Sequence, residues 1–535
     1  MTTQLNKVSI ILSTYNSNPI YLKKALDSIH LQTYKNIELI VVDDASTNTE
    51  HFQLLKVHPA ITKTIFLKKN VGTALSGTEG VKAATGEYVG FLDHDDTLGL
   101  KCVELCVNYL NENLQYGMVY TDHNYVDKDD KIIETIYKED YNEDLLLSRM
   151  YILHFRMYRR SYLTEFMPMK YHGSQDYDLT LRFSEKYKIG HIRKVLYNWR
   201  RSETSTTSQG VSQTIATNSY QAVNDALQRR GIDAQILQED MPTHWHIDRN
   251  LKINDLVSII ILTKNKCNLL KNCIFSIEKF TQYPYEIIIV DTGSTEKDAV
   301  DYLKTLALKY TILNQPFNFS KNNNYAVQHA KGKFLLFLNN DMVVTKDWLT
   351  HMMKQIQRED VGIVGSKLIY PQTKKIQHAG VVLGLGGVAG HLYENFPEDY
   401  PRAISIKEVN AVTGACLLIK KELFDKVGGF DETYIIEFQD IDLNLKVKQL
   451  GYKVIFTPHS KIYHYCSATR GTPSTFECNH DRPYFTHKWK SIMLTTLDPN
   501  LPTNMIGSDY IKMINDHLER YEFNIKNGMY SNGQK

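Results

Sequence analysis

Cysteine is scarce in this sequence. Only 7 of the 535 residues are cysteines, which is an odd number, and no two of them form a C-x-x-C pair. Proteins that depend on disulfide bonds usually carry paired cysteines and occupy an oxidising compartment. The pattern therefore excludes a disulfide framework and favours a reducing environment.

A large excess of charge of one sign is also missing. The 62 basic residues stand against 60 acidic residues, which gives a formal net charge of +2, and the sequence has no long basic run. Proteins that bind nucleic acid usually present a basic surface to the phosphates. We therefore do not expect nucleic acid to be a partner.

Long hydrophobic runs are absent as well. No apolar stretch reaches the roughly 18 residues that a membrane-spanning helix needs. The first residues, M-T-T-Q-L-N-K, lack the apolar core of a signal peptide. We expect a cytoplasmic protein, which leaves peripheral contact with the inner face of the cell membrane open.

Polar residues follow three apolar strands near the N-terminus. The strand 8–13 leads into Thr14 and Asn16, and the strand 37–42 leads into Asp43 and Asp44. Helical spacing of apolar residues between the strands predicts an α/β fold, and short continuous apolar runs are typical of buried parallel strands. Ligands of such sheets bind at the carboxyl ends of the strands, so these residues are candidate ligand contacts.

The third strand, 88–92, ends on the most acidic segment of the region. Asp93 and Asp95 lie two residues apart in L-D-H-D-D. Carboxylates clustered in this way suit a hard divalent ion, Mg²⁺ or Mn²⁺, that carries phosphate. A solvated acidic loop is the alternative interpretation.

Two later segments add candidate residues. Asp176 lies at the start of a predicted helix in G-S-Q-D-Y-D-L, where it is either a catalytic base or a helix cap. Arg200 and Arg201 end a predicted strand, and two guanidinium groups suit a diphosphate or an anionic acceptor.

The second half of the chain repeats these motifs in the same order, roughly 250 residues further on. The repeated positions are Thr14 and Thr263, Asn16 and Asn265, Asp43 and Asp291, Asp95 and Asp341, and Asp176 and Asp440. Asp44 becomes Thr292, and Asp93 becomes Asn339. We predict a first domain over residues 1–235, a linker over 236–256, a second domain over 257–495 and a helical tail over 496–535.

At these motifs the chain resembles the family 2 glycosyltransferases, which are inverting sugar transferases. The resemblance implies two consecutive GT-A (Rossmann-like) domains, each with a mostly parallel sheet flanked by helices. The strand-end aspartate of that family holds the nucleoside, which implies this role for Asp43 and Asp291. Thr14, Asn16, Asp44, Thr263, Asn265 and Arg200 are the further candidate contacts to the nucleotide sugar.

The same resemblance implies the chemistry of the other residues. The D-x-D motif would hold Mn²⁺ or Mg²⁺ through Asp93 and Asp95 in the first copy and through Asp341 in the second. A histidine near the end of the domain, His464, would add a metal ligand in the second copy, whereas Asn198 takes its place in the first. Asp176 and Asp440 match the catalytic base.

The expected reaction is transfer of sugars from a nucleotide-sugar donor, linked to UDP or dTDP, to a growing glycan. A bacterial surface polysaccharide such as O-antigen or capsule is the expected product, and a lipid-linked acceptor stays open. One alternative is a single active copy beside a degenerate copy that binds the acceptor. Another is a sugar-nucleotide pyrophosphorylase, which would need a glycine-rich loop after the first strand, where Thr14-Tyr15-Asn16 stands.

Overall fold

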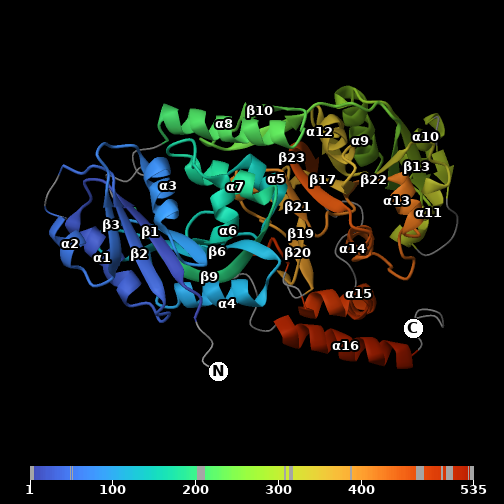
Figure 1. Ribbon diagram of the computed structural model, residues 1–535. Coiled ribbons are helices and arrows are strands. Elements are labelled where there is room, and N and C mark those ends of the chain that lie inside the picture. The colour runs from blue at the N-terminus through green and yellow to red at the C-terminus, as the bar shows by residue number, and fades with distance from the viewer. Residues whose placement is uncertain are drawn as a thin grey trace. The chain divides into compact units, whose positions relative to one another are not determined.

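The computed structural model divides the chain into two compact units, Met1–Ile247 and Asp248–Lys535 (Figure 1). It describes residues 5–47, 50, 52–201, 211–306, 309–311, 317–385, 388–465, 475–495, 498–501, 510–527 and 529. No helix in this described part is long and apolar enough to cross a membrane. Each unit is described by itself below.

Unit 1 alternates strands and helices along its first half and adds antiparallel strands later. Its elements are β1 (Val8–Thr14), α1 (Pro19–His30), β2 (Ile37–Asp43), α2 (Phe52–Val57), β3 (Ile61–Phe66), α3 (Thr73–Ala83), β4 (Tyr88–Asp93), β5 (Thr97–Leu98), α4 (Cys102–Glu112), β6 (Tyr116–Val126), β7 (Ile132–Ile136), α5 (Glu143–Ser148), β8 (Arg156–Arg159), α6 (Arg160–Leu163), η1 (Thr164–Phe166), α7 (Gln175–Ser184), β9 (Lys188–Arg200), α8 (Gln213–Arg229) and β10 (Ala234–Gln238), with β11 (Trp245–Arg249) at its end.

The main sheet of unit 1 has the strand order β3-β2-β1-β4-β8-β6-β9-β5, with β7 paired to β6. Strands β3, β2, β1 and β4 are parallel, and their apolar residues form buried layers between the helices. The register pairs Thr14 with Asp43 and Ser13 with Asp93. The predicted polar strand ends therefore share one edge of the sheet.

Unit 2 repeats this design. Its elements are β12 (Val257–Thr263), α9 (Cys267–Phe280), β13 (Tyr285–Asp291), α10 (Lys297–Thr305), β14 (Lys309–Thr311), α11 (Phe319–Val327), β15 (Phe334–Leu338), β16 (Met342–Val344), α12 (Trp348–Ile356), β17 (Val361–Ile369), β18 (Ile376–His378), β19 (Val381–Leu383), β20 (Ala389–His391), η3 (Pro401–Ala403), β21 (Lys407–Val409), β22 (Cys416–Lys420), α13 (Lys421–Lys426), α14 (Gln439–Gln449), β23 (Lys453–His464), α15 (Thr475–Thr495) and α16 (Tyr510–Lys526).

The main sheet of unit 2 has the order β14-β13-β12-β15-β22-β17-β23-β16, which matches the sheet of unit 1 strand for strand. Its register again pairs a threonine, Thr263, with a strand-end aspartate, Asp291. The prediction of two α/β domains of the GT-A type is confirmed. In each sheet the four strands beyond β4 or β15, which are β8-β6-β9-β5 in unit 1 and β22-β17-β23-β16 in unit 2, include both parallel and antiparallel pairs.

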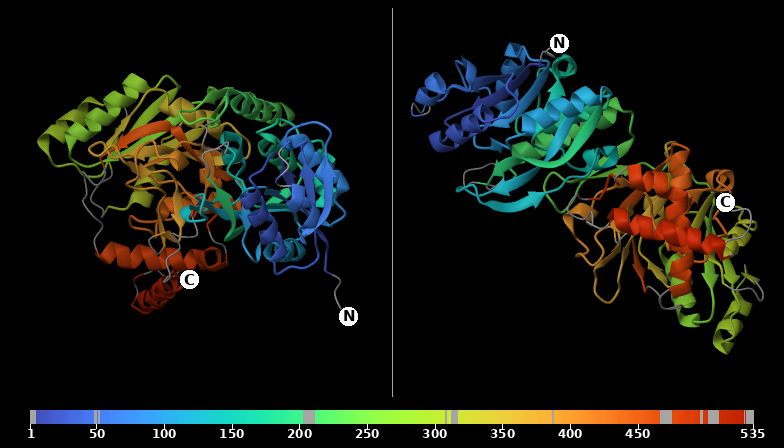
Figure 2. Two further views of the ribbon diagram at one scale, coloured as in Figure 1. Left: turned by 90° about the vertical axis from the view of Figure 1, so that its left-hand side faces the viewer. Right: turned by 90° about the horizontal axis from the view of Figure 1, so that it is seen from below.

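The end of unit 2 carries two helices that unit 1 lacks among its described residues. Helices α15 and α16 pack side by side, and α15 contributes Phe485 and Trp489 to a buried cluster with Tyr434 and Ile441 (Figures 1 and 2). The cluster joins α15 to the start of α14. This contact matters for the second site described below.

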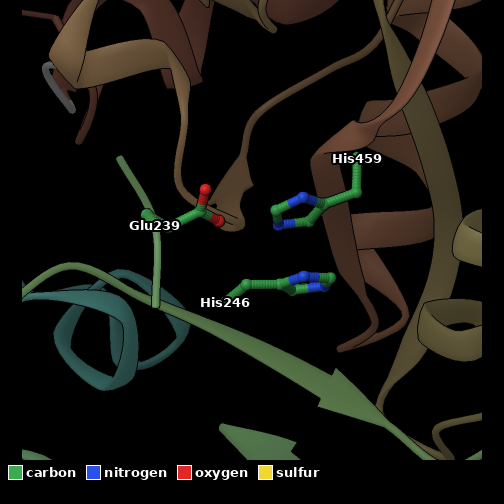
Figure 3. Close-up of side chains that lie close together, drawn as sticks. All are labelled: Glu239, His246 and His459. Carbon is green, nitrogen blue, oxygen red and sulfur yellow. The ribbon is translucent and has the colours of Figure 1, made fainter. Parts of the chain in front are cut away.

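The predicted linker over residues 236–256 contains the end of β10 and all of β11, which form a two-stranded sheet. The indole of Trp245 on β11 donates to Ser219 on α8 at 3.1 Å, which fixes the hairpin to that helix. Figure 3 draws Glu239, which follows β10, and His246 of β11, together with His459 of β23.

Candidate active sites

The loop after β2 is closed by the first pair of predicted nucleotide contacts. Asn16 has a left-handed backbone (φ 46°), and its side-chain oxygen accepts from the N–H of Thr47 at 2.8 Å. Asp43 accepts from the N–H and the hydroxyl of Ser46 at 3.1 and 2.6 Å. The side chains at the ends of β1 and β2 are therefore held in one orientation at the edge of the sheet.

Unit 2 builds the same loop. Asn265 has φ 57° and accepts from the N–H groups of Thr295 and Glu296 at 2.7 and 2.9 Å. Asp291 accepts from the N–H and hydroxyl of Ser294 at 2.9 and 2.7 Å. Asparagine tolerates a positive φ better than most residues, which explains why both copies use it at this position.

Asp44 has a different position from the one expected of a nucleotide contact. It is 4% exposed, and its two carboxylate oxygens accept from the backbone N–H groups of Val71 and Gly72, each at 2.8 Å. The carboxylate therefore anchors the start of α3. Thr292, its counterpart in unit 2, turns its hydroxyl to the carbonyl of Thr263 at 3.1 Å, which also makes a backbone contact.

The acidic end of β4 meets a histidine that the sequence did not indicate. Asp93, Asp96 and His154 place ligand atoms within 4.8 Å of one another. The Nε2 atom of His154 lies 3.5 Å from an Oδ atom of Asp93. Two ligands of one octahedral ion with bonds of 2.0–2.1 Å lie about 3 Å apart, so this donor set fits a divalent cation.

Like charge accumulates at this strand end. Desolvation and the nearby carboxylates of Asp95 and Asp176 raise the pKa of Asp93 to about 7, although 56% of its side chain is exposed. Desolvation, with Asp95 and Asp93 nearby, raises the pKa of Asp96 well above its usual range. Carboxylates with raised pKa values mark negative charge that a bound cation would compensate.

Arg200 does not occupy the position expected of a diphosphate ligand. Its side chain is 1% exposed, its Nε donates to the carbonyl of Asp95 at 2.9 Å, and its other nitrogens bind Asp127 and Asp130. Its backbone N–H donates to Asp96 at 2.7 Å. Arg200 therefore holds the acidic loop in shape from beneath, and we correct the expectation that it contacts the nucleotide sugar.

Contacts with Tyr197 and Lys138 hold His154 in place. The ring is 7% exposed and stacks on Tyr197 with a centroid distance of 4.9 Å, and the Tyr197 hydroxyl donates to Asp96 at 2.5 Å. Lys138 donates to the backbone carbonyl of His154 at 2.6 Å. Burial, with Arg156 nearby, lowers the pKa of His154 to about 3, so the ring is neutral and able to bind a metal ion.

Asp176, the predicted base of the first copy, lies in the first turn of α7, where Ser174 is the N-cap residue. Its carboxylate forms an ion pair of 2.6 Å with the buried guanidinium of Arg156. Desolvation would raise the pKa of Asp176, but the charge of Arg156 and its hydrogen bond to the carboxylate outweigh desolvation and lower the pKa. A carboxylate held in this way is a weaker base than a free one.

The second site brings Asp341 and His464 together. The Nε2 atom of His464 lies 3.3 Å from an Oδ atom of Asp341, and the Nδ1 atom lies 3.3 Å from Oε1 of Gln377. Both side chains are at most 5% exposed. The contact with Gln377 orients the imidazole of His464, and the spacing between Nε2 and Asp341 again fits one divalent cation.

Asp440, the base predicted for the second copy, has no arginine or lysine paired with it among the residues that the structure describes. Its carboxylate accepts from the N–H groups of Gly414 and Ile441 at 2.7 and 2.8 Å. Desolvation raises its pKa, against the opposing effect of these N–H groups and of His391. The pKa values of the two matching carboxylates are therefore shifted in opposite directions.

Helix α15 supports the second base. Asp481 is fully buried and accepts from the backbone N–H groups of Ile436 and Glu437 at 2.8 and 2.9 Å, in the loop that leads to Asp440. Asp442, also fully buried, accepts from the indole of Trp489 at 3.0 Å. Asp442 also pairs with Lys446 of its own helix at 2.9 Å, as the corresponding Asp178 of unit 1 pairs with Arg182 at 2.6 Å.

Sequence reasoning missed three functional candidates: Asp96, His154 and Arg156. Asp96 was visible as the third acid of L-D-H-D-D but had no counterpart in the second copy by which to select it. His154 lies just before β8, and Arg156 is the first residue of that strand. The antiparallel pairing of β8 with β4 joins residues that are far apart in the chain. The motif H-F-R beside a buried strand was the available signal.

The comparisons with known proteins agree with this geometry. Residues 9–166 and 258–428 match the family described as Glycosyl transferase family 2. The chain belongs to this family and carries two copies of the family's domain.

Two relatives are similar along most of the chain. Uncharacterized protein y4gI of Sinorhizobium fredii is 34% identical over 510 residues, which covers 90% of this chain and 56% of that protein. O-antigen biosynthesis protein RfbC of Myxococcus xanthus is 31% identical over 499 residues, which covers 90% of this chain and 39% of that protein. The chain thus spans about half of the first relative's length and less of the second's.

Among solved structures, residues 1–349 of S. aureus TarS in complex with UDP-GlcNAc are similar to part of the chain. The identity is 19%, the match covers 41% of this chain and 66% of that one, and the TM-score is 0.35.

Proposed function

We propose that this protein transfers sugars from nucleotide-sugar donors to a growing bacterial surface glycan, with one metal-dependent, inverting transferase site in each unit. One observation carries the proposal. Each unit repeats a closed strand-end loop around Asp43 or Asp291, a carboxylate and an imidazole 3.3–3.5 Å apart, and an aspartate in the first turn of a helix.

Each part of this arrangement has a task in the reaction. Asp43 and Asp291, with Asn16, Asn265, Thr14 and Thr263 around them, line the edge where the nucleoside of the donor would bind. Mn²⁺ or Mg²⁺, held by Asp93, Asp95 or Asp96 in unit 1 and by Asp341 and His464 in unit 2, would stabilise charge on the departing diphosphate. The donor is a UDP- or dTDP-sugar in this proposal.

The base removes the proton of the acceptor hydroxyl as that oxygen attacks the anomeric carbon. Asp176 and Asp440 are the candidates, and a positioned base contributes typically 10²–10⁴-fold to the rate. A single displacement inverts the configuration at that carbon. The acceptor is a glycan chain, and a lipid-linked form of it would bring the protein to the inner face of the membrane.

A second candidate function is one active copy with the other retained for acceptor binding. The ion pair between Arg156 and Asp176 favours this version with unit 2 as the active copy, because the paired carboxylate is the weaker base. Asn339, which replaces a family metal ligand, favours the opposite assignment. A pyrophosphorylase has no support, since the residues after β1 are Thr14-Tyr15-Asn16 and not a glycine-rich loop.

The experiment is a screen of the purified protein against a panel of sugar nucleotides, with Mn²⁺ or Mg²⁺, an oligosaccharide acceptor and detection of released nucleoside diphosphate. Release that requires both metal and acceptor supports the proposal. Release of pyrophosphate from a sugar phosphate and a nucleoside triphosphate would contradict it.

A further inference from the structure

The two units supply the histidine of their acidic sites from different strands. In unit 2, His464 of β23 pairs with Met342 of β16, directly after Asp341. In unit 1, the matching position of β9 is Asn198, which pairs with Thr97 directly after Asp96. Unit 1 therefore has no histidine at the place where unit 2 has one.

Asn198 uses both ends of its side-chain amide for contacts with neighbouring strands. Its amide oxygen accepts from Asn124 at 3.0 Å, and its amide nitrogen donates to the hydroxyl of Thr97 at 3.1 Å. Both contacts stay within the sheet. The asparagine thus acts as a strand-to-strand link.

His154 enters the same site from the other side. It lies five residues before Arg159, which pairs with Tyr88, and the matching pair in unit 2 is Lys420 with Phe334. Counting back from Lys420 gives Ala415, so unit 2 has no histidine here. Each unit thus carries one of the two histidines and lacks the other.

Several contacts aim the ring of His154 at the carboxylates. Tyr197 stacks on it and Trp199 meets its edge, each with a centroid distance of 4.9 Å. Lys138 fixes its backbone carbonyl. The ring makes no hydrogen bond among the described residues, and its Nε2 atom faces Asp93. A buried imidazole whose Nε2 atom lies 3.5 Å from a carboxylate oxygen suits the role of a metal ligand.

We propose that His154 is the nitrogen ligand of the metal site in unit 1, where it does the task that His464 does in unit 2. The inference rests on the proposed function, because it assumes that this site holds a divalent ion. The inference also favours one of the two candidate ions. An imidazole ligand favours Mn²⁺ over the harder Mg²⁺, which prefers oxygen ligands and water.

The test measures Mn²⁺ binding and needs no turnover. Full-length protein with Asp341→Ala, which removes the carboxylate of the second site, is titrated with MnCl₂, and free Mn²⁺ is followed by electron paramagnetic resonance. In this background His154→Ala should weaken Mn²⁺ binding about 10-fold or more, since loss of even an outer-shell partner costs 10–100-fold. Mg²⁺ affinity, from competition, should fall much less. His30→Ala, which removes an exposed histidine of α1, is the matched control.

A rescue variant guards against simple damage to the fold. Asn198→His, added to His154→Ala, places an imidazole where unit 2 has His464 and should restore Mn²⁺ binding to within a few-fold. Unchanged Mn²⁺ affinity in His154→Ala, with loss of binding in Asp93→Ala, overturns the inference but leaves the metal site in place. Unchanged affinity in Asp93→Ala as well would instead defeat the metal dependence in the proposed function. Failure of the rescue in a folded double variant would also overturn the inference.

Discussion

The ion pair between Arg156 and Asp176 should set the pH dependence of the first transfer. An arginine beside an aspartate lowers the pKa of the carboxyl group by about 1–3 units. Arg156→Met keeps much of the side-chain volume and removes the charge. We therefore expect the acid limb of the kcat/KM profile of the first transfer to move up by about 1–3 pH units, equivalent to about 1.4–4 kcal/mol.

The assay uses the Asp440→Asn background, so that only the first transfer is counted, with product quantified by mass at each pH. Arg159→Met is the matched control, because this arginine lies on the same strand and donates to the carbonyls of Tyr116 and Leu110 rather than to Asp176. An acid limb in Arg156→Met that coincides with the parent, or moves to lower pH, would refute the assignment of Asp176 as the base.

The same pair affects stability with a defined sign. Because the pKa of Asp176 is lowered in the fold, the pair stabilises the protein above the unfolded-state value of about 4, and this contribution disappears as pH falls through the lowered pKa. The Tm deficit of Arg156→Met should therefore be largest near neutral pH and narrow below about pH 4. A deficit independent of pH would show that the loss is one of packing.

Three further outcomes follow from the sites. Asp176→Asn and Asp440→Asn should each abolish a different transfer, which mass spectrometry would show as products that end at different sugars. If Asp440→Asn makes the wild-type product, only the first copy is active. The acid limb of the second transfer should lie at higher pH than that of the first, because the pKa of Asp440 is raised and that of Asp176 is lowered. Asp44→Ala should lower the free energy of unfolding, measured in urea, by about 1–3 kcal/mol for each backbone N–H left without a partner. The refolded variant should still bind the nucleotide sugar. Normal stability with lost nucleotide-sugar affinity would support the expected nucleotide contact.

The repeat made the fold predictable. Val8–Asn16 and Val257–Asn265 share a pattern that only a buried parallel strand followed by a polar turn explains, and each occurs in a matching order of elements. Asp43 and Asp291 were predictable for the same reason, because parallel strands that start in register also end at one edge.

The rest of the sites could not be predicted, since they depend on which face a side chain takes and on pairings distant in the chain. Arg200 stands at a strand end like the aspartates, but its side chain points beneath the acidic loop. Arg156 of β8 pairs with Asp176 of α7, a contact between two different elements of the fold. No spacing in the sequence encodes that approach.

The duplicated units are not interchangeable parts. Each of the two helices pairs its buried aspartate with a cation one turn along, Asp178 with Arg182 and Asp442 with Lys446. Asp442 also binds the Trp489 indole and the Lys488 ammonium group of α15. An insertion or truncation near residue 475 would thus disturb the candidate site of unit 2, although Asp341, Asp440 and His464 all precede it in the chain. A copy of the second unit that is moved or duplicated afresh must therefore bring helix α15 with it, because Lys446 alone does not replace the contacts from Trp489 and Lys488.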